Sequence, residues 1–175
     1  MKKVLIPVLL LLFIIAALAA CSKNQNEGAL TVEQFRQKAE AAGYRVEDME
    51  ITPEDQEEEP GLTACLAFLK DTEEGFYHAG HFKIFNSAKN AGGFYDSGKN
   101  DLGEMEQILK ADGNDVPGSS LEDNNFAYFT RSFTSIEDDP FYAAILRRGK
   151  TTIDVMSSAA IQEEMEQFLR DLGYL

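Results

Sequence analysis

Two histidines are the first residues of this sequence that could take part in chemistry. His78 and His81 stand three residues apart, and imidazole nitrogen is a common ligand of zinc. The segment around them is expected to be a strand, in which residues three apart point to opposite faces of the sheet. Because a zinc site needs three or four converging ligands, this spacing favours one exposed and one packed histidine over a metal site.

Acidic clusters form the second group of candidates, at residues 54–59, 112–115 and 137–139. Calcium takes oxygen ligands, but an EF-hand loop needs acids at positions 1, 3 and 5 and a glycine at position 6. The stretch Asp112-Gly113-Asn114-Asp115-Val116 breaks that pattern at its fifth position. We therefore expect solvated loops, with calcium as the alternative. Whether two carboxylates could cleave a glycosidic bond depends on their separation in space, which spacing along the chain does not decide.

Cys65 is a candidate nucleophile in an apolar run from Leu62 to Leu69. A thiol buried among apolar side chains is normally inert, so a Cys/His dyad with His78 or His81 on an adjacent strand is the weaker interpretation. The sequence has no Gly-x-Ser-x-Gly or Ser-x-x-Lys pattern and no glycine-rich phosphate loop after a strand. These observations predict a protein that is not an enzyme and carries no cofactor.

Arg147, Arg148 and Lys150 form the one basic group on a strongly acidic chain, whose formal net charge is −14. That charge argues against a nucleic-acid partner, because such proteins present a basic face to the phosphates. The three cations fall at the tip of an expected hairpin, where we expect them to be exposed to solvent. A contact patch for an acidic partner or a phosphate is the alternative interpretation.

The N-terminus has the pattern of a secretory signal: Met1-Lys2-Lys3, an apolar run from Val4 to Ala17, and then Leu18-Ala19-Ala20-Cys21. The last four residues resemble the lipobox of bacterial lipoproteins with a type II signal peptide. This resemblance implies removal of residues 1–20 and attachment of lipid to the Cys21 thiol. A single transmembrane helix is the alternative.

The same resemblance implies where the protein is located. The lipid would hold the chain to a membrane on its extracytoplasmic face, and Ser22 would permit sorting to the outer membrane in a Gram-negative cell. Residues 21–29 are polar and are typical of a short tether. Residues 30–175 then form one domain's worth of chain, with Cys65 its one cysteine.

The elements that position the candidate residues follow from the spacing of apolar side chains. Residues 30–44 begin with a capping box, Thr31 and Gln34, and form the clearest helix. Residues 87–110 predict one interrupted helix or two short ones, because Gly92-Gly93 weakens the pattern, and residues from Ser157 or Ser158 onward form the last helix. Loops are expected at 52–60, 111–124 and 134–140. Strands are expected at 44–51, 62–69, 76–85, 125–133, 141–147 and 151–156.

This order, α-βββ-α-βββ-α, predicts an α+β domain with an antiparallel sheet and helices on one face. Together with the predicted lipid anchor and the lack of a catalytic motif, it predicts a membrane-anchored, non-catalytic module that binds an envelope protein or a ligand. An envelope hydrolase using carboxylates and a small-molecule carrier are the alternatives. A carrier needs a sizeable apolar pocket between sheet and helices, and a hydrolase needs facing acids in a cleft.

Overall fold

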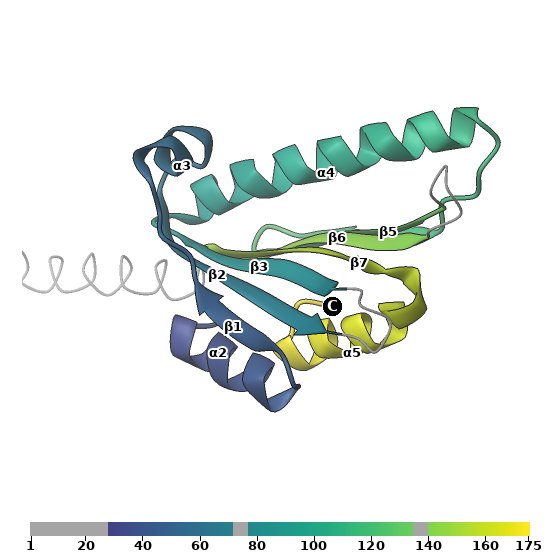
Figure 1. The fold of residues 1–175 in the computed structure, drawn as a ribbon. Coiled ribbons are helices and arrows are strands. Elements are labelled where there is room, and N and C mark those ends of the chain that lie inside the picture. The colour runs from purple at the N-terminus through teal and green to yellow at the C-terminus, as the bar shows by residue number, and fades with distance from the viewer. Residues whose placement is uncertain (1–27, 72–76, 135–139) are drawn as a thin grey trace, which may run out of the picture.

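The computed structural model describes residues 28–71, 77–134 and 140–175. Its centre is one antiparallel sheet of seven strands in the order β1-β2-β3-β7-β6-β5-β4 (Figure 1). The strands are β1 (Arg45–Asp48), β2 (Leu62–Asp71), β3 (Tyr77–Phe85), β4 (Gly118–Glu122), β5 (Phe126–Phe133), β6 (Phe141–Arg148) and β7 (Thr151–Ser158). The predicted α+β class with an antiparallel sheet is confirmed. Among the described residues, no helix has the length and apolar character needed to cross a bilayer.

Two meanders, β1-β2-β3 and β4-β5-β6-β7, meet at the middle of the sheet. Their junction is the pairing of β3 with β7, which runs from Ala79 opposite Met156 to Ile84 opposite Thr151. Strand β4 lies within the segment predicted as a loop, so that prediction was wrong for these residues. All five residues of β4 are exposed, and without a buried face the strand leaves no alternating pattern in the sequence.

The helices are α2 (Val32–Ala41), α3 (Pro53–Glu58), α4 (Ala88–Ala111) and α5 (Gln162–Leu172), the last preceded by a 3-10 turn, η1 (Ala159–Ile161). The capping box predicted at Thr31 and Gln34 starts α2. Helix α3 replaces part of the predicted loop at 52–60. Thr52 accepts a hydrogen bond from the Asp55 amide and Asp55 caps Thr52 in return, with Pro53 in the first turn, so a second capping box overrides the acidic composition.

Helices cover both faces of the sheet, which corrects the prediction that they lie on one face (Figure 1). On one face, Phe35 of α2 stacks on Phe82 at 4.3 Å between ring centroids and also packs near Phe168 of α5. On the other face, Tyr95 of α4 packs with Ile145. The reason lies in β6, where residues 142–146 are all buried, because a strand covered on both faces is apolar at successive positions.

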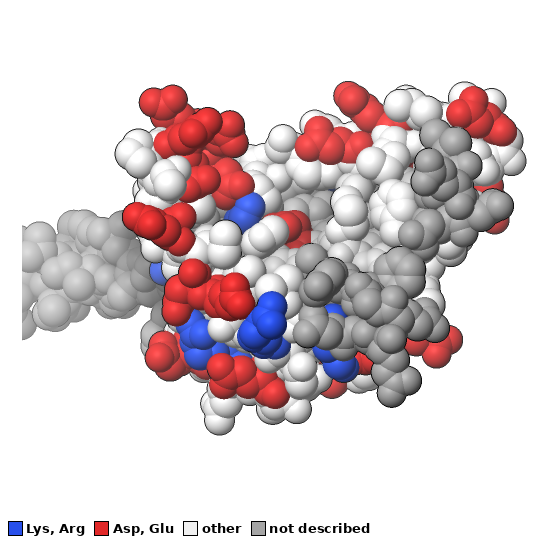
Figure 2. Space-filling model, in the orientation of Figure 1, with Lys and Arg blue, Asp and Glu red and all other residues white. Residues whose placement is uncertain are grey.

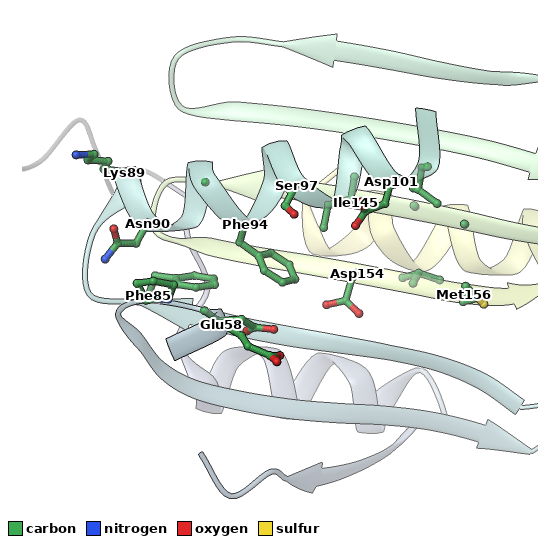
Figure 3. Close-up of a pocket in the computed structure, with 18 residues that line it drawn as sticks. Glu58, Phe85, Lys89, Asn90, Phe94, Ser97, Asp101, Ile145, Asp154 and Met156 are labelled. Carbon is green, nitrogen blue, oxygen red and sulfur yellow. The ribbon is translucent and has the colours of Figure 1, made fainter. Parts of the chain in front are cut away.

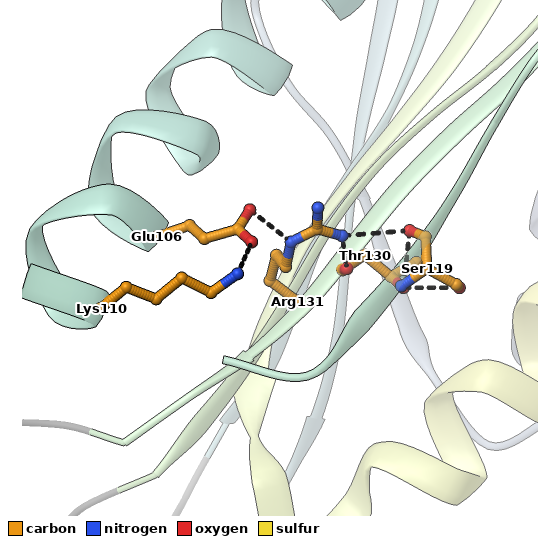
Figure 4. A network of polar contacts seen from close by, with 5 residues as sticks. All are labelled: Glu106, Lys110, Ser119, Thr130 and Arg131. Atoms are coloured by element: carbon orange, nitrogen blue, oxygen red, sulfur yellow. Dashed lines mark hydrogen bonds and ion pairs between the residues drawn. The ribbon is translucent and has the colours of Figure 1, made fainter. Parts of the chain in front are cut away.

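Helix α4 is continuous over 24 residues, so Gly92-Gly93 does not interrupt it. Its first turn is capped by Ser87, which accepts from the Asn90 amide. Near its end, Glu106 accepts hydrogen bonds from Arg131 Nε at 2.6 Å and from Lys110 at 2.7 Å (Figure 4). Arg131 also donates to the backbone carbonyl of Thr130 at 2.7 Å, so this network ties the C-terminal half of α4 to β5.

Candidate functional site

A groove lies between the N-terminal half of α4 and the sheet, with a cavity volume of about 740 Å³ (Figure 3). Its apolar walls are formed by Phe85, Phe94, Leu102, Ile145 and Met156. The volume falls in the range of small-molecule pockets, roughly 300–1,000 Å³. Met156 is 56% exposed although it is a large apolar residue, so the groove presents apolar surface to solvent.

Small residues of α4 keep the groove open. Gly93, Ser97 and Gly98 follow one another along the helix where it lines the groove. A Cβ at Gly93 would meet no atom within 4 Å, whereas a Cβ at Gly98 would lie 3.2 Å from Ile145 Cγ1. Gly98 therefore allows close approach of α4 to β6. Gly93 is exposed and stands two residues from the buried Ala91 and Tyr95, so it lies on the opposite side of the helix. A glycine inside a helix costs about 1 kcal/mol relative to alanine.

Lys83 places a buried positive charge directly beneath the groove, against three residues that line it, Glu59, Phe94 and Asp154. Its ammonium donates to Glu59 Oε1 at 2.7 Å and lies 3.7 Å from Asp154 Oδ1. It also lies 4.1 Å from the centre of the Phe94 ring, a cation–π distance. Only 9% of Lys83 is exposed, and a buried charge persists only where it is paired.

His81 forms the next step of this network. Its Nδ1 lies 2.8 Å from Asp154 Oδ2, and because a carboxylate can only accept, the imidazole donates that hydrogen bond. Asp154 thus joins His81 to Lys83. We call Glu59, His81, Lys83 and Asp154 the charged floor. Glu59 and Asp154 share a cation between them rather than facing each other as the acid pair of a glycosidase does.

The register of the sheet assembles the charged floor. His81 lies opposite Asp154 across β3 and β7, and Lys83 lies opposite Cys65 across β2 and β3. Residues two apart on a strand share a face, so His81 and Lys83 both face α4 while Phe82 packs into the other core. Glu59 comes from the turn after α3, where Gly61 adopts φ +83°.

Cys65 lies beside this floor as a thiol rather than a thiolate. Burial raises its pKa to about 11, with the Lys83 charge opposing that shift. A nucleophilic cysteine needs the opposite change. Across β2 and β3, Cys65 pairs with Lys83, and His81 pairs with Ala67, so neither histidine is the strand partner of Cys65. The side chain of His78 lies outside the part of the chain that the structure describes.

The predicted basic patch is divided between two faces of the sheet. Arg147 donates to the backbone carbonyls of Asp123 and Asn124. Arg148, its neighbour in β6, donates to the Gly173 carbonyl at 2.6 Å on the opposite face. Lys150 follows in the turn before β7. The two arginines therefore hold different parts of the backbone on opposite faces and do not form one contact surface.

Two of the three acidic clusters lie on separate parts of the described structure. Residues 54–58 lie on α3 and residues 112–115 follow α4, while residues 137–139 lie outside the described residues. Within the described ranges, no group of three or more His, Cys, Asp or Glu side chains is arranged to hold a metal. Figure 2 shows acidic side chains gathered over α3 and at the far end of α4. The predicted lipobox with Cys21, and the predicted tether as far as residue 27, also lie outside the described residues.

Sequence reasoning named His81, and Glu59 within an acidic cluster, but it missed Lys83 and Asp154 and did not bring the four residues together. A usable signal existed, since Lys83 stands between Phe82 and Ile84 and Asp154 between Ile153 and Val155. A single charge inside an apolar strand needs a partner when the strand is covered on both faces. What the sequence lacked was the pairing of β3 with β7, which joins residues far apart in the chain.

Comparisons of this chain with protein-family models, with curated proteins and with solved structures found no match in any of the three. Function must therefore be inferred from the chemistry of the groove itself.

Proposed function

We propose that this protein is a membrane-anchored lipoprotein that binds a small molecule, without catalysis, in the groove between α4 and the sheet. Of the ligand-binding and protein-interaction hypotheses that the sequence left open, the groove favours a small ligand. The observation that carries the proposal is the groove itself, a concave space of about 740 Å³ with aromatic and aliphatic walls and a few polar groups at its floor. This composition is typical of ligand pockets.

The position of the groove supports an anchored binding protein. Gly28, where the described chain begins, packs against the guanidinium of Arg148. The turn between β6 and β7 follows Arg148 directly. It contacts Phe85, a residue that lines the groove, because the Phe85 amide donates a hydrogen bond to the Lys150 carbonyl at 2.9 Å. One end of the groove therefore lies on the side of the domain where the chain enters. With lipid on Cys21, as the lipobox implies, this end would face the membrane.

The test is to fill the groove from α4. Ser97→Leu enlarges a side chain that points from α4 toward the groove (Figure 3). Gly103→Leu places the same side chain on the same helix outside the groove, where its Cβ would meet no atom within 4 Å. The probe is N-phenyl-1-naphthylamine, an apolar dye that fluoresces when it leaves water. We expect saturable binding to the unaltered protein and to Gly103→Leu, and at least tenfold weaker binding to Ser97→Leu.

Circular dichroism melts of both variants check that each is folded. No saturable binding by the unaltered protein, or equal binding by the two leucine variants, would remove the groove as the binding site.

A further inference from the structure

The charges around the groove are unbalanced, and they suggest the class of ligand. We propose that the ligand is an organic cation, an amine or similar group on an apolar body; this inference rests on the proposed function. The groove is lined by four carboxylates, Glu58, Glu59, Asp101 and Asp154, and by one ammonium, Lys89. Lys83 adds a second ammonium from the floor, so negative charge remains in excess.

The excess is carried by carboxylates without a cation of their own. Glu59 and Asp154 share Lys83, whereas Glu58 and Asp101 are exposed and take part in none of the ion pairs between described residues. Acidic side chains over α3 extend this field along the rim (Figure 2). A cleft lined by one sign of charge raises the local concentration of ligands of the opposite sign.

Hydrogen-bonding capacity at the floor points the same way. Glu59 Oε2 and Asp154 Oδ1 are buried acceptors that have no hydrogen-bond partner among the described residues. The two donors nearby are already engaged, since the Lys83 ammonium is held by Glu59 Oε1 at 2.7 Å and His81 donates to the other Asp154 oxygen, Oδ2, at 2.8 Å. Spare acceptors need a donor, and an ammonium supplies up to three without adding an acceptor. An anionic head group would add acceptors to a floor that already has too many.

The aromatic wall suits a cation as well. Phe85 and Phe94 lie 5.6 Å apart between ring centres, and the Lys83 ammonium already lies over Phe94. The face of an aromatic ring attracts positive charge, most strongly where water is excluded. The protein therefore holds one ammonium of its own between an aromatic face and two carboxylates, which shows that this environment stabilises a cation.

The experiment compares three ligands that share a chain and differ in charge. Decylammonium, decanol and decanoate are titrated against bound N-phenyl-1-naphthylamine at pH 7, each below the concentration at which it forms micelles. We expect decylammonium to displace the dye at a concentration at least tenfold lower than decanoate, with decanol between them. The preference should weaken as salt is added, because salt screens exposed charges.

Charge variants show whether the groove carboxylates cause the preference. Asp101→Asn removes a carboxylate at the rim of the groove, and Glu104→Gln removes one from the same helix outside the groove. Both residues are exposed, so folding should be unaffected. We expect Asp101→Asn to weaken decylammonium several-fold while decanol is unchanged, and Glu104→Gln to change neither.

Two outcomes are separable. Dye binding with equal displacement by all three ligands, or with decanoate the strongest, would overturn the cation assignment and leave the groove as a binding site. Failure of the dye to bind would instead overturn the proposed function on which this assignment rests.

Discussion

Lys83 organises the floor of the groove through contacts that no neighbour in sequence provides. Its ammonium is shared between Glu59 from the turn after α3 and Asp154 from β7, below the ring of Phe94 from α4. A single side chain therefore connects three separate parts of the chain. Breaking a buried ion pair by removing one partner costs more than the pair contributes, because the remaining charge stays buried without compensation.

Lys83→Met should therefore lower the free energy of unfolding by about 2–3 kcal/mol, less than for fully buried pairs because the carboxylates are partly exposed. Urea denaturation at pH 7 measures this change. Adding Glu59→Gln to the same chain should recover part of the loss by removing one uncompensated charge. The matched control is Lys99→Met, whose ion pair with Glu122 is more exposed than that of Lys83 with Glu59 and should be worth less than about 1 kcal/mol. Equal effects of the two lysine variants would contradict a special role for Lys83.

Helix α4 is the element that creates the groove, and its ends are held differently. The C-terminal half is tied to β5 through Glu106 and Arg131 (Figure 4). Burial would raise the pKa of Glu106, but hydrogen bonds from Lys110 and Arg131 outweigh it and hold that pKa below its usual value, so the carboxylate stays charged at the clamp. The N-terminal half stands over the groove, where Gly98 faces Ile145 of β6.

The glycines of α4 predict opposite effects of one substitution at two positions. Gly98→Leu should destabilise the protein by about 1–3 kcal/mol, because even its Cβ would press on Ile145 and overpacking costs this much. Gly103→Leu should be neutral or stabilise by up to about 1 kcal/mol, because leucine favours the helix and meets no neighbour. Chemical denaturation of both variants checks the prediction, and a stabilised Gly98→Leu would mean that α4 can move away from β6.

Elements were predictable where local signals were complete. The first helix carries a capping box and one apolar face, and the hairpin of β6 and β7 has two apolar strands around Arg148-Gly149-Lys150, so both appear where they were predicted. Strand β4 has no buried face to leave a pattern. Helix α3 did leave one, the Thr52–Asp55 capping box, but the acidic composition led to its interpretation as a loop.

The whole molecule is held by an aromatic core on the face that α2 and α5 cover. Phe35, Phe68, Tyr44 and Phe168 pack against one another there. The placement of helices on two faces could not be predicted, since it depends on which strands become neighbours. The groove and its charged floor follow from the same non-local pairing, so the sequence indicated His81 without indicating what it would contact.

Buried phenols of this molecule predict loss of stability in alkali. Burial raises the pKa of Tyr95 and of Tyr174 to about 12 from an ordinary value of 10.0. A group with a raised folded-state pKa contributes its full stabilisation below its unfolded pKa and loses it as pH rises through the folded value. The free energy of unfolding should therefore fall between about pH 10 and pH 12, by roughly 1.4 kcal/mol for each tenfold difference in proton affinity between the folded and unfolded chain.

Urea midpoints measured at pH 9 and pH 11.5 test this expectation. Cys65 contributes in the same direction, because burial raises the pKa of its thiol to about 11. Tyr174→Phe should show a smaller alkaline loss than the unaltered protein, since one titrating group is gone. A midpoint that does not change with pH would show that these phenols are accessible in the folded state.

The junction of β3 with β7 also has a consequence for how the protein is made. His81 and Asp154 are partners in the sheet, yet they stand 73 positions apart in the chain, and such distant contacts make folding slow because a long loop must close first. When a chain appears with its N-terminus first, β3 cannot pair with β7 until β7 has also appeared. In an exported lipoprotein, as we propose this protein to be, the delay would be an advantage. The groove could form only after the chain had been exported as far as Met156, the last residue that lines it.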